Sequence, residues 1–311
     1  MLTFMGVNTR GERLSLPSPV EAVLCRDAGT PADSLTAVFP CVIYDELCYI
    51  AVYKDGKEIF SGIVDEQITV SGENVKTKLV CRSMAALLVD NEAQPCTFRD
   101  VSASLIFSRY VKPLGFASFT GEDKTLRGEF RVAKGESCWQ VLEDFCSKAY
   151  GVFPVVEGNR VYMQGTEGNK ECLVFSDKGD GIAYSNLEHN LLRCKLISCV
   201  RCKVTQGEDY TSYICNEDAQ ARGVLRERYL NADELSGKSL ADADKLIVSA
   251  RAKAEKFTLL VPQCMTDIPG AQAVVCDSAV GEHRGLYVTG IRYSLNSTGE
   301  TTRLTLMRKE N

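Results

Sequence analysis

The stretch YIAVYKDGKEIFSGIVDEQITVSGENVKTKLVCR, residues 49–82, decides the fold class of this 311-residue chain. Its first half places Asp55-Gly56 between the apolar runs Tyr49–Tyr53 and Glu58–Val64. Asp-Gly between two such runs is a strong hairpin signal, because both central residues of the tight turn need a positive φ. This half therefore predicts two antiparallel strands joined by a two-residue turn.

The second half of the stretch predicts another hairpin, from Gln67–Val70 through the turn Ser71–Asn74 to Val75–Arg82. In the last strand every second residue from Val75 to Cys81 falls on one face, and the lysines between them fall on the other. This alternation is typical of a half-buried strand. Short runs elsewhere predict strands at Leu2–Val7, Val20–Cys25 and Leu35–Phe39, and a short helix at Met84–Val89.

The composition is that of a globular protein, with 45% hydrophobic and 25% charged residues. The net charge of −5 argues against sequence-specific nucleic-acid binding, which usually involves a basic patch. Residues 1–92 hold most of the acidity, with 8 Lys or Arg against 13 Asp or Glu. Such a surface repels DNA, although an ordinary solvated surface would give the same counts.

Neither a targeting signal nor a membrane span is expected. The first ten residues lack a basic segment followed by an apolar core, and no run approaches the roughly 18 apolar residues that a span requires. The 14 cysteines are interpreted as reduced thiols that serve as small core residues.

The length of the chain and its changes of pattern predict three domains. Residues 1–92 form a first β-domain, residues 93–170 a small α+β insert, and residues 171–311 a second β-domain with a helix at about 238–256. The predicted fold class is mainly β, with two similar antiparallel β-domains and a small middle domain.

Two helices are predicted in the insert. Asp100 caps a helix that runs from Val101 to about Val111, and Ser137 caps a second helix from Cys138 to Ala149. The apolar residues of the second helix recur at helical spacing and form one face. A hairpin follows at Val152–Val156, Glu157–Asn159 and Arg160–Met163.

In the last third, Leu191–Val204 and Asp209–Cys215 predict a long antiparallel pair around Gln206-Gly207. Lys238–Lys256 is the longest predicted helix. The chain ends in predicted strands at Ala273–Cys276, Gly285–Leu295 and Thr301–Arg308.

The ends of the two β-domains share a design. Gly62 and Gly285 each precede two apolar residues and a strand, which then turns at Gly72-Glu73 or Gly299-Glu300 into an alternating strand. A duplicated domain would explain this likeness, but antiparallel hairpins share turn chemistry in any case. Both explanations remain open at this point.

The chain contains two histidines, His189 and His283. Either could pair with a cysteine as a nucleophile and base. No nucleophile elbow or other motif surrounds them, so they are interpreted as exposed loop residues. Glu143 and Asp144, candidates for a glycosidase carboxylate pair, are adjacent on a helix and face different ways. No catalytic residue and no cofactor is therefore predicted.

Cys199 and Cys202 form a C-x-x-C motif, with Cys194 and Cys215 nearby, and are the only metal-site alternative. If Leu191–Val204 is one strand, Cys199 and Cys202 point to opposite faces and cannot bind one ion. The prediction is that no metal is bound and that these are core cysteines.

Three segments carry a family resemblance: Phe60–Leu88, Glu136–Glu143, and Ile268–Gly270 with Gly285–Ser294. Together they resemble phage baseplate hub proteins, the group that includes the late control protein D type and the Mu-type hub. The likeness spans nearly the whole chain and keeps the order of the motifs. One departure is Ala271, where the family usually has an acidic residue.

The resemblance implies a homotrimer in which each subunit supplies two similar tail-tube-like β-barrels. The resulting ring of six domains joins a hexameric tail tube to a trimeric spike. The implied partners are the tube protein, the central spike protein and other baseplate proteins, with the tape measure as a further candidate. The implied location is the baseplate centre of a virion or tailocin-type particle, assembled in the bacterial host cytoplasm. The alternative is a tail-associated cell-wall hydrolase or carbohydrate-binding protein.

Overall fold

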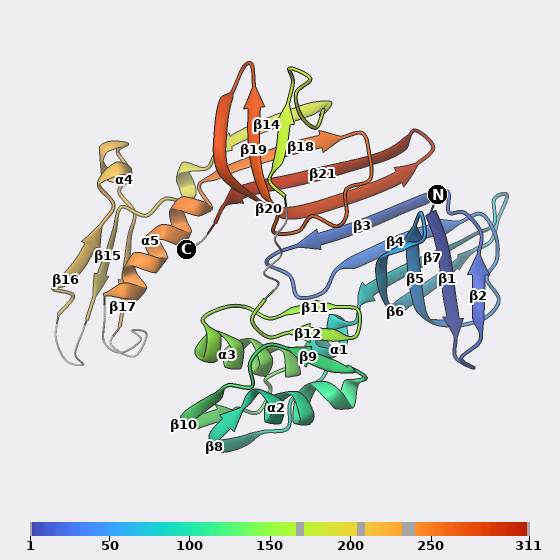
Figure 1. Cartoon of the computed structure of the whole chain (residues 1–311), viewed down its shortest axis with the longest axis horizontal. Coiled ribbons are helices and arrows are strands. Elements are labelled where there is room, and N and C mark those ends of the chain that lie inside the picture. The colour runs from blue at the N-terminus through green and yellow to red at the C-terminus, as the bar shows by residue number, and fades with distance from the viewer. Residues whose placement is uncertain (1, 166–170, 204–208, 232–239, 310–311) are drawn as a thin grey trace. The chain divides into compact units, whose positions relative to one another are not determined.

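The computed structural model describes residues 2–165, 171–203, 209–231 and 240–309 (Figure 1). Contacts divide the chain into two compact units, which are described separately. Unit 1 comprises residues 1–169, 263–269 and 291–302, and unit 2 comprises residues 170–262, 270–290 and 303–311. Strands make up most of the regular structure in both units, which confirms the mainly β fold. The three-domain division at residues 92 and 170 stays a prediction.

The main sheet of unit 1 is built from the first seven strands. Its strand order is β2-β1-β5-β6-β7-β4-β3, followed by the end of β20. The strands are β1 (Leu2–Asn8), β2 (Arg13–Leu16), β3 (Glu21–Asp27), β4 (Ser34–Phe39), β5 (Leu47–Lys54), β6 (Lys57–Val70) and β7 (Lys76–Ser83). The predicted strands are all present, and β2 is an addition that the sequence pattern did not indicate.

The first predicted hairpin is confirmed. Asp55 has a φ of 51° and Gly56 a φ of 84°, so both central residues of the turn adopt the left-handed conformation. Lys54 and Lys57 then pair directly, and β5 runs antiparallel to β6. The local Asp-Gly signal therefore sets the register of these two strands.

The second predicted hairpin is also confirmed, with one correction. β6 is a single 14-residue strand rather than two runs, because an irregularity between Val64 and Glu66 lets its pairing with β7 continue. In β7 the side chains of Thr77, Leu79 and Cys81 are fully buried, whereas Lys76 and Lys78 are exposed. The predicted alternation of faces is therefore correct from Thr77 on, whereas Val75 precedes the strand and is exposed.

The core of this sheet includes residues from far along the chain. Tyr293 is buried among residues of the first seven strands. The guanidinium of Arg26 donates to the carbonyls of Ile59 and Thr266, both at 2.5 Å. The ammonium of Lys54 lies 2.6 Å from the carboxylate of Glu300. Segments 263–269 and 291–302 are thus structural parts of unit 1.

A second hydrophobic core in unit 1 lies among helices and short strands of residues 84–163. These elements are α1 (Ala85–Asp90), β8 (Cys96–Ser102), α2 (Ala103–Ile106), a π-helix (Phe107–Val111), a 3-10 helix (Lys112–Leu114), β9 (Ser118–Thr120), β10 (Thr125–Val132), α3 (Cys138–Tyr150), β11 (Val155–Glu157) and β12 (Arg160–Tyr162). The predicted helix α3 is confirmed, with a capping box between Ser137 and Gln140 and its apolar face buried. Trp139 is part of this core.

The predicted cap at Asp100 is wrong. Asp100 lies in β8 with a φ of 59°, and its carboxylate accepts a hydrogen bond of 2.7 Å from the backbone of Gly128. The N-cap is Ser102, whose hydroxyl accepts from the backbone of Leu105 at 3.2 Å. Both residues are good caps, and the bulged pairing of β8 with β10 decides between them.

Within unit 2 the strands pair in the order β14-β18-β21-β20-β19-β13. These strands are β13 (Leu173–Ser176), β14 (Asn186–Leu191), β18 (Glu255–Val261), β19 (Gln272–Asp277), β20 (Gly281–Asn296) and β21 (Gly299–Arg308). The predicted closing hairpin of the chain is confirmed, because β20 and β21 are neighbours just as β6 and β7 are.

A three-stranded sheet in unit 2 has the order β16-β15-β17 and packs against a helix (Figure 1). Its elements are β15 (Cys199–Cys202), β16 (Ser212–Cys215), β17 (Glu227–Leu230), α4 (Glu217–Ala221) and α5 (Ala241–Ala252). Ile247 of α5 is buried together with Val200 and Cys202 of β15. The predicted helix at about 238–256 is present as α5, which ends at Ala252, earlier than expected; residues 238 and 239 lie outside the described residues. The longest helix described is α3.

The prediction of one strand over Leu191–Val204 is wrong. β14 ends at Leu191, and a 3-10 helix over Arg193–Lys195 precedes β15. The guanidinium of Arg226 donates to the carbonyls of Cys194 and Leu196, so these groups need no partner strand. The antiparallel pairing with the 209–215 region is confirmed, while the turn at Gln206-Gly207 lies outside the described residues.

Among the described residues, no helix is both long and apolar enough to cross a membrane.

Candidate functional site

The outer half of the β6–β7 hairpin is exposed. β5 pairs with β6 only as far as Ile63, whereas β7 pairs with β6 out to Val70. Within the described residues, the segment from Val64 to Val70 therefore has a neighbouring strand on one side only. Ile68, with 39% of its surface exposed, and Val70 add apolar side chains to this edge. An unpaired strand edge is a site where another chain can add a strand.

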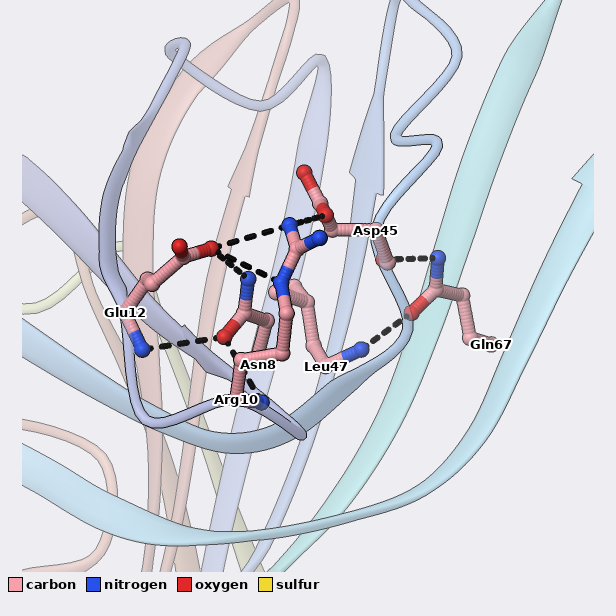
Figure 2. Close-up of polar contacts among 6 residues, drawn as sticks. All are labelled: Asn8, Arg10, Glu12, Asp45, Leu47 and Gln67. Carbon is pink, nitrogen blue, oxygen red and sulfur yellow. Dashed lines mark hydrogen bonds and ion pairs between the residues drawn. The ribbon is translucent and has the colours of Figure 1, made fainter.

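The loop between β4 and β5 lies beside this edge and is held by Gln67 (Figure 2). The side-chain oxygen of Gln67 accepts from the backbone of Leu47 at 3.0 Å. Its amide nitrogen donates to the carbonyls of Ile43 and Asp45, both at 3.0 Å. One side chain thus satisfies three backbone groups, two in the β4–β5 loop and one at the first residue of β5.

A buried threonine holds the other end of the loop. The Thr77 hydroxyl accepts from the backbone of Ile43 at 3.1 Å and donates to the carbonyl of Cys41 at 2.8 Å. Between these anchors the side chain of Tyr44 is 91% exposed. A fixed loop that presents an exposed aromatic ring is typical of a contact surface, because aromatic anchors contribute much of the energy of interfaces.

The turn between β1 and β2 is joined to the same loop (Figure 2). The buried side chain of Asn8 accepts from the backbones of Arg10 and Glu12, at 3.0 and 2.9 Å, and donates to the Glu12 carboxylate at 2.7 Å. Arg10 then forms an ion pair of 2.8 Å with Asp45. Exposed pairs of this kind contribute little stability, so we assign the pair a role in orienting the loop.

The base of the hairpin is held by Arg82. Its guanidinium contacts both carboxylate oxygens of Asp65, at 2.7 and 2.9 Å, and both of Asp90, at 3.0 and 2.6 Å. Hydrogen bonds to these carboxylates raise the pKa of Arg82, and the bond from Arg82 lowers the pKa of Asp90. Cys81 directly precedes Arg82. Burial and then the charge of Asp65 raise the pKa of the Cys81 thiol to about 12.

Gln67→Leu tests the anchoring of the loop. We expect the variant to lose about 2 kcal/mol of unfolding free energy, because three backbone hydrogen bonds of roughly 1 kcal/mol each are removed and solvent replaces them only in part. Urea unfolding measures this loss, and hydrogen exchange at residues 41–47 shows whether the loop opens. Gln272→Leu is the matched control, since Gln272 is exposed and its side chain makes one 3.3 Å contact, with Tyr287. Equal losses in the two variants would contradict the anchoring role.

The structure separates the cysteines of the C-x-x-C motif. Cys202 is buried against α5, whereas Cys199 pairs across the sheet with Cys215, their sulfur atoms 2.9 Å apart. Burial and then the contact with Cys215 raise the pKa of Cys199 to about 11. Cys194 is exposed, and among the described residues no three of these four cysteines lie close enough together to hold one ion.

All 14 cysteines are free thiols. Only five of them are buried: Cys81, Cys138, Cys146, Cys199 and Cys202. The interpretation of the cysteines as core residues holds for these five, and the others lie at intermediate or exposed positions. Composition alone could not separate the two groups.

The expectation that both histidines are exposed loop residues is wrong. His189 lies in β14 and His283 in β20, both within unit 2, and each is only partly exposed. Both contact the carboxylate of Glu255. Burial, the largest influence, raises the pKa of Glu255, but Arg308 and the two histidines outweigh it, and the net pKa is lowered. The sequence interpretation missed Glu255, because it lies 66 residues from His189 and no local motif connects them.

Glu143 and Asp144 lie side by side on α3, as predicted. The Asp144 carboxylate forms an ion pair of 2.7 Å with Lys148, one helical turn further on. Asp144 is thus engaged in a surface pair on the helix itself.

Solved structures with the same fold include tail proteins and a component of a type VI secretion system. A tail protein of Neisseria meningitidis MC58 matches with a TM-score of 0.77 and 17% identity, over 99% of this chain and 97% of its own. The 43 kDa tail protein of prophage MuSo2 from Shewanella oneidensis matches with a TM-score of 0.81 and 13% identity, over 99% and 98%. An Escherichia coli type VI secretion component, described as similar to the T4 tail proteins gp27 and gp5, matches with a TM-score of 0.60 and 11% identity, over 99% and 77%.

At these identities the likeness establishes the fold, which is that of phage tail and baseplate-related proteins. No family model matches the sequence. No curated protein matches it either.

Proposed function

We propose that the chain is the hub subunit of a contractile phage tail or a phage-tail-like particle, located at the centre of the baseplate. Three copies form a ring in which the two β-domains alternate, so the ring presents sixfold pseudosymmetry to the tail tube and threefold symmetry to the spike. A ring of alternating domains closes only if the two domains offer similar surfaces. The observation that supports this proposal best is the recurrence of one closing hairpin, β6–β7 and β20–β21, within a fold shared with tail proteins.

The exposed edge of β6 and the Tyr44 loop supply a contact surface for such a ring. A neighbouring subunit or the tube protein can extend the sheet at Val64–Val70, whose edge away from β7 has no strand partner among the described residues. The Tyr44 ring then adds an aromatic anchor beside the added strand. The further proposed partners are the spike protein and other baseplate proteins, and the proposed role is structural rather than catalytic.

The mass of the assembly and a surface variant test this proposal. We expect wild-type protein at micromolar concentration to sediment at about 103 kDa, three times the 34.2 kDa subunit. Ile68→Asp should reduce the mass to that of a monomer, because a charge at the β6 edge would be buried in the contact. Leu105→Asp is the matched control, since Leu105 is 40% exposed against 39% for Ile68 but lies on α2. We expect it to leave the mass unchanged.

Three outcomes would contradict the proposal. Wild-type protein that stays monomeric would exclude a ring that forms from this chain alone. A trimer that survives Ile68→Asp would exclude the β6 edge as the contact. Clearing of peptidoglycan in a zymogram would favour the alternative, a tail-associated cell-wall hydrolase.

A further inference from the structure

Three side chains from three strands of unit 2 converge on one point. His189 comes from β14, Glu255 from β18 and His283 from β20. Each offers one ligand atom, and the three atoms all lie within 4.8 Å of one another. Among the described residues, no other group of His, Cys, Asp or Glu side chains meets this condition.

The pairing of the strands explains the convergence. β14 and β18 run antiparallel, with His189 opposite Phe257 and Leu191 opposite Glu255. Residues two apart on a strand share a face, so His189 and Glu255 project from the same face of the sheet as diagonal neighbours. The backbone therefore fixes their approach.

The two distances from Glu255 to the histidines are close to those between ligands of one small ion. The carboxylate oxygen Oε1 of Glu255 lies 3.0 Å from Nε2 of His189 and 3.5 Å from Nδ1 of His283. Ligand atoms bound tetrahedrally at about 2.0–2.1 Å from zinc are about 3.3 Å apart. An ion can thus be placed among the three atoms with small shifts of the side chains.

The surrounding groups orient each ligand. Nε2 of His283 lies 3.2 Å from the carbonyl of Val280, so this nitrogen can carry the proton and leave Nδ1 free to bind. Arg308 holds the second oxygen of Glu255 at 2.9 Å, which leaves Oε1 toward the histidines. The ring of Phe257 stacks on His189 at 4.3 Å and 5°. Supporting contacts of this kind are found around metal ligands in proteins.

We propose that His189, Glu255 and His283 form a binding site for a divalent transition metal ion of the zinc class. Two imidazoles and one carboxylate are a ligand set that binds zinc and leaves a fourth position for water. The three side chains are 17–20% exposed, so water can reach that position. The ion would join β14, at the end of its sheet, to β18 and β20. This inference does not depend on the hub function proposed above.

Zinc binding to the metal-free protein tests the site. After removal of metals with a chelator and reduction of the thiols, titration calorimetry with zinc chloride should show one ion bound per chain with micromolar affinity or tighter. His283→Ala and Glu255→Gln should each weaken binding at least 10-fold, since loss of a ligand or its charge removes part of the set. Zinc should raise the Tm of the wild-type protein, because an ion that binds only the folded state stabilises it.

The 14 thiols require a separate control, because cysteines also bind zinc. The double variant Cys199→Ser and Cys202→Ser should retain the wild-type affinity. Cobalt, used in place of zinc, should give the visible spectrum of nitrogen and oxygen ligands without a thiolate charge-transfer band. A thiolate band, or loss of binding in the cysteine variant, would overturn the proposal in favour of a cysteine site.

The zinc affinities of the ligand variants can be compared with that of the wild type only if the variants are folded. Circular dichroism and urea unfolding establish this, and Glu255→Gln keeps the size of the side chain. If folded His283→Ala binds zinc as tightly as the wild type, or if the wild type binds no zinc, the proposal is wrong.

Discussion

Gly62→Ala is expected to destabilise unit 1 by at least about 3 kcal/mol. A Cβ at position 62 would lie 2.0 Å from the carbonyl oxygen of Arg82, and also within 3 Å of the backbone of Ser83. These atoms belong to β7, which pairs with β4 and β6 and cannot move away without breaking a ladder. Adding atoms to a packed region usually costs about 1–3 kcal/mol. Because the obstacle here is backbone, which cannot rotate away as a side chain can, we expect the cost to reach or exceed the top of this range.

Gly72→Ala is the matched control for this prediction. Gly72 lies in the turn of the same hairpin, has no atom within 4 Å of its would-be Cβ, and has no positive φ. The unfolding free energy measured in urea should therefore be unchanged or slightly higher, because alanine reduces the conformational freedom of the unfolded chain. If the two alanine variants are equally stable, the close approach of β6 and β7 at Gly62 is not a constraint.

Phe145→Ala is expected to cost about 4 kcal/mol of unfolding free energy. Phe145 is fully buried on α3 and contacts the rings of Phe130 and Tyr150. Truncation of a buried phenylalanine leaves a cavity and removes apolar contacts, for which 3–5 kcal/mol is typical.

The control variant is Phe153→Ala, because the side chain of Phe153 is 68% exposed in the same region of the chain. The unfolding free energy of this variant should stay within about 0.5 kcal/mol of the wild type, as for most surface substitutions. Urea unfolding followed by the fluorescence of Trp139, which lies in the same core as Phe145, reports on this core directly. A loss below 1 kcal/mol in Phe145→Ala would show that the core is loosely packed.

Local signals predicted much of this fold. Asp55-Gly56 fixes a turn through its own two residues, and Ser137 with Gln140 caps α3 within four residues of sequence. Such features need no information from distant parts of the chain. The strands of the first sheet were found for the same reason, since alternation within one strand reports which face is buried.

The predictions that were wrong concern positions where a residue far away in the sequence determines the local structure. Arg226 satisfies the carbonyls of Cys194 and Leu196 between β14 and β15, and no pattern within Leu191–Val204 reveals this. Asp100 and Ser102 are both good caps, and pairing with β10 selects Ser102. The cluster of His189, Glu255 and His283 is the extreme case, because its members are ordinary strand residues until the sheet brings them together.

The late segments of unit 1 have a consequence for synthesis of the protein on the ribosome. Tyr293, Glu300 and Thr266 complete contacts that begin at residues translated long before them. The first sheet can start to form early, but β3 gains its neighbour β20 only after about 290 residues have been made. Until then the nascent chain carries an open strand edge and an incomplete core, and both promote association with other chains. We therefore expect the yield of folded protein to depend more on chaperone binding and slow elongation than on the stability of the finished chain.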